Sequence, residues 1–381
     1  MGDRSLPALR GSRHGEKKRN NLPQRGAQFQ HTSMKANVLY HIGDLRYTDV
    51  ALPELHDGEA LVRVRACGIC GSDVARVFTT GTYHFPTIIG HEFSGEVVET
   101  CSAADAEWVG RRVSVFPLIP CRHCDACHHG QYEMCTCYNY LGSRTDGGFA
   151  EYVAVPVWNL FRLPDSISYE EGAMMEPAAV AMHALKIACV GMGDTVAITG
   201  PGTIGMILAQ LIQRIGGTKA VLIGRTQAKL DYARRIGIRH VCNSGTEHVA
   251  DRVGQLTEGR GADIAIEGTG AGEPMNLCLN LVRSEGRIVA MGNPQGDMLF
   301  RKDAYWKLLR KQLTLRGTWN STYGLGRDDW QDISALLAEG ALNLQGLITH
   351  RLPLAELQQG LSLMRDATVY TNKVMIVNEQ G

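Results

Sequence analysis

A glycine-rich turn in the middle of the chain constrains the fold more than any other feature. A G-x-G-x-x-G pattern occupies Gly200-Pro201-Gly202-Thr203-Ile204-Gly205, directly after an apolar run over 195–199 and directly before a helical run over 204–215. Such glycines permit a tight turn, the approach of backbone amides to a pyrophosphate and close packing of helix on strand. In this context the pattern predicts a βαβ unit that binds a dinucleotide at the N-terminus of its helix. A glycine turn without a ligand is the alternative. The predicted cofactor-binding loop consists of Gly200, Gly202, Thr203, Ile204 and Gly205.

The periodicity of apolar residues changes along the 381-residue chain. Up to about residue 155, short runs alternate apolar and polar residues, as in strands separated by glycine-rich turns. From about residue 176, helical runs alternate with apolar strands, which predicts an α/β region with a parallel sheet. We predict helices at 178–189, 204–215 and 330–339, strands at 195–199, 220–223, 264–267 and 287–291, and a closing strand at 373–377. The predicted boundaries are 1–33 for an extension, 34–176 for the first domain, 177–312 for the dinucleotide-binding domain, and 313–381 for a return to the first domain.

Charge and hydropathy exclude several classes of partner. The chain carries 39 Lys and Arg against 39 Asp and Glu, so no overall basic field favours a nucleic acid or an anionic membrane. No apolar run reaches the roughly 18 residues that a membrane-spanning helix needs. We therefore expect a cytoplasmic protein that acts on a small molecule, with neither a nucleic acid nor a membrane as partner.

Residues 1–33 differ from the rest of the chain. They hold seven basic residues against two acidic ones and show no apolar periodicity. We favour a misassigned start or a vector-derived leader, and we expect the segment to be disordered. An Arg-rich organelle-targeting peptide is the alternative, weakened by Pro7 and Pro23. The fold prediction leaves this segment out.

Four of the eleven cysteines lie close together in the sequence. Their C-x2-C-x2-C-x7-C spacing places four thiols on one loop, and a tetrahedral zinc ion accepts four thiolates at about 2.3 Å each. The spacing therefore predicts a closed structural zinc site. A set of buried or loosely paired thiols is the alternative. The predicted ligands are Cys121, Cys124, Cys127 and Cys135.

Three further residues are candidates for a second metal site in the cleft between the domains. Cys70 follows a strand, His91 precedes another, and Glu176 stands where the second domain begins. One thiolate, one imidazole and one carboxylate leave the fourth position of a zinc ion open for substrate, as a catalytic site requires. Taken singly, each residue also has a structural interpretation: a packed thiol, a hydrogen-bonded core histidine and a carboxylate at a helix start.

The residues after the second strand of the dinucleotide region indicate which coenzyme is preferred. A carboxylate usually stands there when the adenosine ribose is unphosphorylated, but this sequence has Gly224 and Arg225. Glycine leaves room, and Arg225 together with Lys229 supplies positive charge for a 2′-phosphate. We therefore predict NADP over NAD. An arginine lying over the adenine, without phosphate specificity, is the alternative.

Together these segments resemble a known family. Cys70-Gly71-Ser72-Asp73, Gly90-His91-Glu92, the four-cysteine loop and the glycine motif are similar to the zinc-dependent medium-chain dehydrogenase/reductase superfamily over residues 34–381. Glu176-Pro177, where many alcohol dehydrogenases have a cysteine, resembles the polyol dehydrogenase branch. The resemblance implies a GroES-like, mostly-β catalytic domain, a Rossmann domain with a doubly wound parallel sheet, and a homo-oligomer.

The resemblance also implies roles for single residues. Glu92 would be a further zinc ligand or a neighbouring carboxylate, Asp73 would orient the histidine ligand, and Ser72 would take the proton of the alcohol. The histidine that continues the proton path in many alcohol dehydrogenases is replaced by Ala75. The implied ligands of the catalytic zinc are Cys70, His91 and Glu176.

More narrowly, the segments 90–95, 141–152, 309–313 and 317–320 resemble galactitol-1-phosphate 5-dehydrogenases. This implies hydride transfer from a secondary hydroxyl of a polyol or polyol phosphate to NAD(P), with galactitol 1-phosphate to tagatose 6-phosphate as the leading reaction. Two alternatives stay open. One is a dehydrogenase of an unphosphorylated polyol or diol, such as sorbitol or butane-2,3-diol, and the other is a non-catalytic sensor of dinucleotide or zinc.

Overall fold

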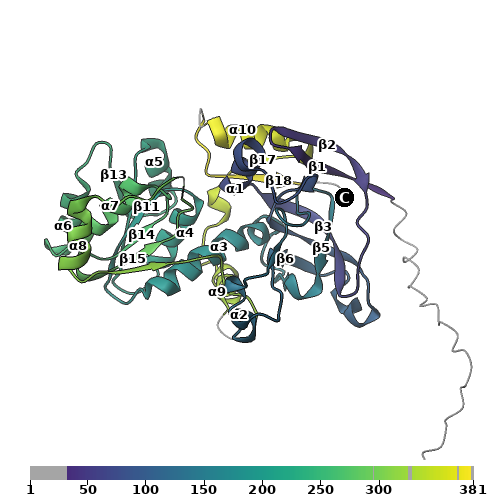
Figure 1. Cartoon of the computed structure of the whole chain (residues 1–381), viewed down its shortest axis with the longest axis horizontal. Helices are drawn as coiled ribbons and strands as arrows, with labels where there is room; N and C mark the ends of the chain where they lie inside the picture. The colour runs from purple at the N-terminus through teal and green to yellow at the C-terminus, as the bar shows by residue number, and fades with distance from the viewer. Residues whose placement is uncertain (1–31, 295, 325–327, 367–368, 379–381) are drawn as a thin grey trace, which may run out of the picture. The chain divides into compact units, whose positions relative to one another are not determined.

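The computed structural model describes residues 32–378, apart from 295, 325–327 and 367–368 (Figure 1). The extension predicted at 1–33 lies outside the described residues up to residue 31. The described chain begins at Thr32 and enters its first strand, β1, at Ser33. No described helix is long and apolar enough to cross a membrane.

Antiparallel sheets form most of the first part of the chain. A seven-stranded sheet has the order β10-β6-β5-β3-β18-β17, with β9 also paired to β3, and two smaller sheets have the orders β2-β1-β4 and β7-β8. In β3, Val62 and Val64 are buried while Arg63 between them is partly exposed, so the alternation predicted from the sequence points apolar side chains into the core. The strands are β1 (Ser33–His41), β2 (Asp44–Ala51), β3 (Glu59–Gly68), β4 (Thr87–Ile88), β5 (Glu92–Thr100), β6 (Arg112–Val115), β7 (Leu118–Ile119), β8 (Asn139–Tyr140), β9 (Tyr152–Pro156), β10 (Leu160–Arg162), β17 (Ile348–Leu352) and β18 (Lys373–Val377).

The end of the chain completes the sheet that the beginning starts. Strand β18 pairs antiparallel with β3, with Met375 opposite Gly68, and β17 pairs in parallel with β18. Figure 1 shows these late strands beside the early ones. The closing strand predicted at 373–377 is confirmed. This pairing brings Lys373 to the end of β3, where several candidate site residues lie.

Residues 195–317 build a separate, fully parallel sheet of six strands. Its order is β13-β12-β11-β14-β15-β16. Counted from its first strand this is 3-2-1-4-5-6, the order of a Rossmann fold, whose crossover direction reverses between β11 and β14. The predicted fold class is therefore confirmed. The strands are β11 (Thr195–Thr199), β12 (Lys219–Gly224), β13 (His240–Asn243), β14 (Ala262–Glu267), β15 (Val282–Ala290) and β16 (Thr314–Gly317).

Helices cover both faces of the parallel sheet. Along β11, Val196 and Ile198 pack into one core with α3, α4, α5 and α9, while Ala197 packs into another with α6, α7 and α8. Both faces are buried, which explains the uninterrupted apolar runs of these strands. The helices are α3 (Tyr169–Ala188), α4 (Thr203–Ile212), α5 (Gln227–Arg235), α6 (Val249–Thr257), α7 (Gly272–Leu281), α8 (Lys302–Arg310) and α9 (Asp329–Ala338), and α10 (Leu357–Asp366) packs near β17 and β18.

Two elements differ from the sequence-based expectation. Helix α3 begins at Tyr169 rather than 178, because Ser168 and Glu171 form a capping box, and it continues through Pro177. The predicted boundary between 176 and 177 therefore falls inside a helix. Strand β16 belongs to the parallel sheet, so this sheet extends beyond the predicted boundary at 312. The domain boundaries themselves stay predictions.

Candidate active site and metal centres

Cys70, His91 and Glu92 come together where β3 and β5 pair. Gly68 lies opposite Glu92 in this antiparallel pair, so the residues just after β3 meet those at the start of β5. Cys70 is the N-cap of the short helix α1 (Gly71–Ala75). One ligand atom from each of Cys70, His91 and Glu92 lies within 4.8 Å of the other two. Of the three predicted zinc ligands, Cys70 and His91 are thus brought together.

Glu176 borders this group from helix α3. It is buried within the helix, not at its start, so the interpretation as a helix-start carboxylate is wrong. Among the described residues, the group within 4.8 Å includes Glu92 and not Glu176. The Tyr140 hydroxyl donates to Glu176 Oε1 at 3.4 Å, and the ring centroids of Tyr140 and His91 are 5.8 Å apart. Tyr140 therefore connects Glu176 with the histidine, a position that sequence reasoning missed.

Several acidic side chains crowd together in a largely buried site. Burial disfavours the imidazolium, yet the charges of Asp73 and Cys70 hold the pKa of His91 well above its usual range. Burial raises the pKa of Glu176 to about 7. Burial, followed by the charge of Glu176, raises the pKa of Tyr140. A divalent cation would relieve this charge, and a thiolate, an imidazole and carboxylates are ligands that suit Zn²⁺. The residues present therefore fit a catalytic zinc.

Asp73 stands behind the histidine, as expected for an orienting carboxylate. Its side chain is fully buried, and its Oδ1 lies 3.4 Å from His91 Nδ1. Its Oδ2 accepts a hydrogen bond from the Cys70 amide at 3.0 Å. Although burial opposes ionisation, attraction to His91 and Arg76 lowers the pKa of Asp73. The same carboxylate is thus tied to both the thiol and the imidazole that the sequence predicts as ligands.

Ser72 is held by a residue that sequence reasoning missed. Arg76 Nη1 donates to Ser72 Oγ at 2.9 Å and to Asp73 Oδ1 at 3.0 Å. Ala75, which stands where many alcohol dehydrogenases have a relay histidine, directly precedes Arg76. Residues four apart share a helix face, so the spacing of Ser72 and Arg76 was a readable signal for this contact.

Lys373 supplies a buried positive charge beside the group. Its Nζ lies 2.5 Å from Glu92 Oε2 and donates to the Ile69 carbonyl at 3.1 Å, and both side chains of the ion pair are almost fully buried. Burial disfavours the ammonium, yet the charges of Glu92 and Cys70 outweigh that effect and raise the pKa of Lys373. A single lysine in a C-terminal strand carries no motif, so the sequence could not have indicated it.

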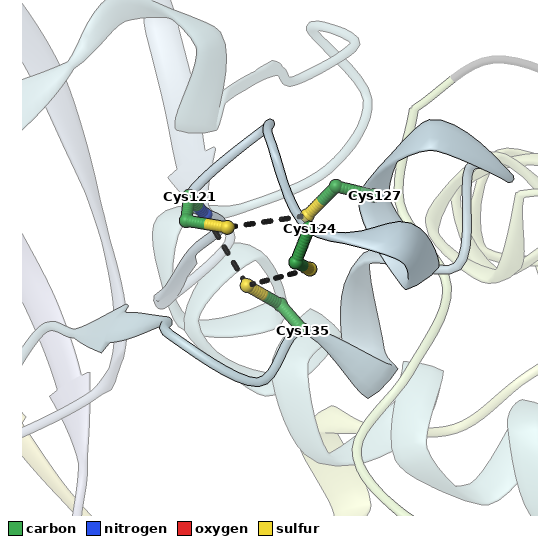
Figure 2. A group of neighbouring side chains, drawn as sticks. All are labelled: Cys121, Cys124, Cys127 and Cys135. Carbon is green, nitrogen blue, oxygen red and sulfur yellow. Dashed lines mark hydrogen bonds between the residues drawn. The ribbon is translucent and has the colours of Figure 1, made fainter.

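The four clustered cysteines face one another, as Figure 2 shows. Their sulfur atoms all lie within 4.8 Å of one another, with 4.0 Å between Cys121 and Cys127 and 3.8 Å between Cys124 and Cys135. Four sulfurs placed tetrahedrally at zinc bond length stand about 3.8 Å apart, so the observed spacing fits a zinc ion. Backbone amides of Cys127 and Thr136 lower the pKa of Cys124 to about 5, which favours a thiolate there. No disulfide is present among the described cysteines.

The glycine motif has the geometry that a dinucleotide requires. Gly200 adopts φ +98°, in the left-handed region, and a Cβ at Gly205 would lie 2.1 Å from the Gly200 carbonyl oxygen. A Cβ at Gly202 would meet nothing within 4 Å, so this residue, the N-cap of α4, leaves space that a phosphate can fill. The Thr203 hydroxyl donates to the Asn372 carbonyl at 3.3 Å, and Ile204 is partly buried at the start of α4. The loop thus contacts the residue directly before Lys373.

Gly224, Arg225 and Lys229 follow the second parallel strand. A Cβ at Gly224 would lie 2.3 Å from Pro201 Cγ, so a larger residue does not fit beside the glycine loop. Arg225 is exposed and Lys229 is partly buried one turn further along. No carboxylate occupies this strand end, and two cationic side chains are available to an anionic group.

Comparison with known proteins gives a consistent result. Residues 56–165 match the family described as "Alcohol dehydrogenase GroES-like domain", and residues 203–339 match "Zinc-binding dehydrogenase". Galactitol 1-phosphate 5-dehydrogenase of Escherichia coli K12 is 33% identical over 320 residues, covering 84% of this chain and 92% of that protein. The crystal structure of galactitol-1-phosphate dehydrogenase from Escherichia coli has a TM-score of 0.84 at 32% identity, covering 90% of this chain and 100% of that one.

Two further solved structures are similar. A Sinorhizobium meliloti protein bound to NADP has a TM-score of 0.83 at 30% identity, and 2R,3R-butanediol dehydrogenase from Bacillus subtilis has 0.81 at 27%. Each alignment covers 91% of this chain and 100% of the other. The chain therefore belongs to the zinc-dependent medium-chain dehydrogenase/reductase superfamily, in its polyol dehydrogenase branch, and is an NAD(P)-linked alcohol or polyol dehydrogenase.

Proposed function

We propose that the enzyme oxidises a secondary hydroxyl of a polyol phosphate, with galactitol 1-phosphate to tagatose 6-phosphate as the leading reaction and NADP as the preferred acceptor. The observation that carries the proposal is the meeting of Cys70, His91 and Glu92, whose ligand atoms all lie within 4.8 Å of one another. The activity named for the Escherichia coli relative, which covers most of this chain, supports the choice of substrate.

Cys70, His91 and Glu176 hold the catalytic zinc in this proposal, and Glu92 is a further ligand or a neighbouring carboxylate that can displace a water from the metal. When bound, zinc polarises a hydroxyl oxygen and lowers its pKa. The Asp73 carboxylate, whose Oδ1 lies 3.4 Å from His91 Nδ1, favours the tautomer with its hydrogen on Nδ1 and so leaves the other ring nitrogen free to bind the metal. Lys373 forms an ion pair with Glu92 and restrains its position.

Ser72 receives the hydroxyl proton of the substrate and passes its own proton towards solvent. Arg76 donates a hydrogen bond to Ser72 Oγ, which holds the hydroxyl group in position. A bound nicotinamide would supply the acceptor for the hydride that leaves the carbon carrying the reacting hydroxyl. The substrate thus loses one hydride and one proton and becomes a ketone.

Four finer assignments belong to the same proposal. A second zinc ion is held by the four clustered cysteines, which gives two per chain. Gly200, Gly202, Thr203, Ile204 and Gly205 bind the pyrophosphate. Gly224, Arg225 and Lys229 receive the 2′-phosphate of NADP, an acceptor choice that the NADP-bound Sinorhizobium meliloti neighbour supports. The protein forms a homo-oligomer, as the superfamily resemblance implies.

A substrate panel tests this function. Zinc-replete enzyme is assayed with galactitol 1-phosphate, galactitol, sorbitol and butane-2,3-diol, each with NADP and with NAD. We expect the highest kcat/KM for galactitol 1-phosphate with NADP. A higher value for an unphosphorylated polyol or for the diol would favour the second candidate, which the likeness to butanediol dehydrogenase supports.

A pair of variants tests the site itself. Glu176→Ala should abolish turnover, whereas Glu339→Ala, which alters an exposed glutamate at the end of α9, should leave turnover unchanged. Unchanged turnover in Glu176→Ala would remove this residue from the metal site.

A further inference from the structure

A basic pocket lies at the amino ends of the parallel strands, at the end of the sheet opposite the glycine loop. Lys219 and His240 begin β12 and β13, whereas Gly200 follows the carboxyl end of β11. The pocket has a volume of about 360 Å³, and Arg214 and Arg239 complete its charged lining. Because dinucleotides bind at the carboxyl ends of such strands, this pocket at the amino ends belongs to a different site.

The cations of this pocket lack acidic partners. In the described part of the chain, neither arginine nor Lys219 has a carboxylate oxygen within 4.0 Å. Lys219 Nζ donates to the Leu256 carbonyl at 2.6 Å, and Arg214 Nη1 donates to the Ala341 carbonyl at 3.3 Å. These neutral acceptors orient the side chains without cancelling their charge.

The positive charges around the pocket act on the imidazole of His240. Burial and then the positive charges of Arg252, Lys219 and Arg239 lower the pKa of His240. The carboxylate of the nearby Asp194 is engaged elsewhere, with Arg287 at 3.0 Å and the Gly191 amide at 2.9 Å. Residues 34–381 have a negative formal balance, with 32 Lys and Arg against 37 Asp and Glu, so this pocket is a local exception.

Backbone donors add to the pocket. Among the described residues, the amides of Gly216 and Gly217 have no hydrogen-bond acceptor, although the neighbouring amides of Ile215, Thr218 and Lys219 each have one. Gly217 adopts φ +73°, and both glycines are exposed. Successive free amides around a left-handed residue form a concave anion site in many proteins.

We propose that this pocket binds a phosphate-class anion, either inorganic phosphate or the phosphate group of a phosphorylated metabolite. Guanidinium and ammonium groups and free amides donate to the oxygens of a phosphate, and two arginines can each offer paired donors. The volume exceeds that of a lone phosphate and leaves space for an organic part. This site is independent of the active site and of the proposed function.

Isothermal titration of the full, zinc-replete chain without dinucleotide tests the proposal. Inorganic phosphate and glucose 6-phosphate are titrated separately at matched ionic strength, with chloride as the reference anion. We expect saturable binding of at least one phosphate compound. In the double variant Arg214→Gln/Arg239→Gln, the Kd should rise at least about tenfold, because two charge-assisted contacts are lost. Tighter binding of glucose 6-phosphate identifies a phosphorylated metabolite as the ligand class, and tighter binding of phosphate identifies the free anion.

Two control variants separate this pocket from other sites. Arg162→Gln removes an exposed arginine of β10 and should leave the Kd unchanged. Glu176→Ala alters the active site and should also leave it unchanged. Absence of binding, an unchanged Kd in the double variant, or loss of binding in Glu176→Ala would each overturn the proposal.

Discussion

Replacing Lys373 by methionine breaks the most deeply buried ion pair of the site. The lysine side chain is 4% exposed and that of Glu92 is 2% exposed, so neither charge has water to replace its partner. Removing one member of a buried pair costs about 3–5 kcal/mol because the other charge stays buried alone. Methionine keeps most of the lysine's apolar volume, so the packing loss adds little. We therefore expect Lys373→Met to lower the free energy of unfolding by about 3–5 kcal/mol in metal-free protein.

A double-mutant cycle measures the electrostatic part of this loss. Glu92→Gln alone should also destabilise, whereas Lys373→Met combined with Glu92→Gln should lose less than either single variant, because no buried charge is left unpaired. The assay is urea unfolding followed by fluorescence and by circular dichroism, since agreement of the two supports a two-state free energy. Zinc should restore part of the stability of Lys373→Met by placing positive charge beside Glu92.

The control for this cycle is Lys302→Met, which changes an exposed lysine at the start of α8 and should alter stability by no more than about 0.5 kcal/mol. A loss below about 1 kcal/mol in Lys373→Met, or losses in the double variant that equal the sum of the single ones, would refute the reasoning.

Three further outcomes are expected. Arg225→Asp should shift the ratio of kcat/KM from NADP towards NAD, and a ratio that hardly moves would contradict the assignment of the ribose pocket. Arg76→Met should lower kcat/KM by about tenfold or more through loss of the contact with Ser72, with partial recovery in Arg76→Lys; equal activity in all three proteins would exclude the orienting role. Burial opposes ionisation of Asp329, but hydrogen bonds from His183 and Lys186 lower the pKa of this carboxyl group. The ionised carboxylate therefore stabilises the folded protein at pH values above the ordinary pKa of aspartate, and this stabilisation is lost as the pH falls through the lowered pKa. The unfolding midpoint should therefore fall less steeply with decreasing pH in Asp329→Asn than in the unaltered protein. An equally steep fall in both proteins would contradict this.

Local sequence signals predicted the parts of the structure that depend on local chemistry. The glycine motif is readable because Gly200 and Gly205 meet steric demands that no other residue satisfies. The cysteine loop is readable because its four thiols lie within fifteen residues, so their meeting needs no long-range information. The apolar strands of the parallel sheet are readable because both of its faces are buried.

The site contacts that the sequence did not predict join segments that are far apart in the chain. Lys373 and Glu92 are 281 residues apart in sequence, and only the pairing of β18 with β3 brings them together. Tyr140 reaches Glu176 in the same way, from a two-stranded sheet to a helix. The capping box of Ser168 and Glu171 is a local signal for the start of α3, but the sequence-based prediction began this helix only at residue 178.

The zinc content of the purified protein tests the central claim most directly. We expect mass spectrometry of the metal to find two zinc ions per chain in the natural sequence, one in Cys70→Ala, and two in Cys101→Ala, which removes a cysteine outside both clusters. Loss of polyol oxidation should accompany the loss of one ion in Cys70→Ala. Two zinc ions and undiminished oxidation in Cys70→Ala would contradict the account.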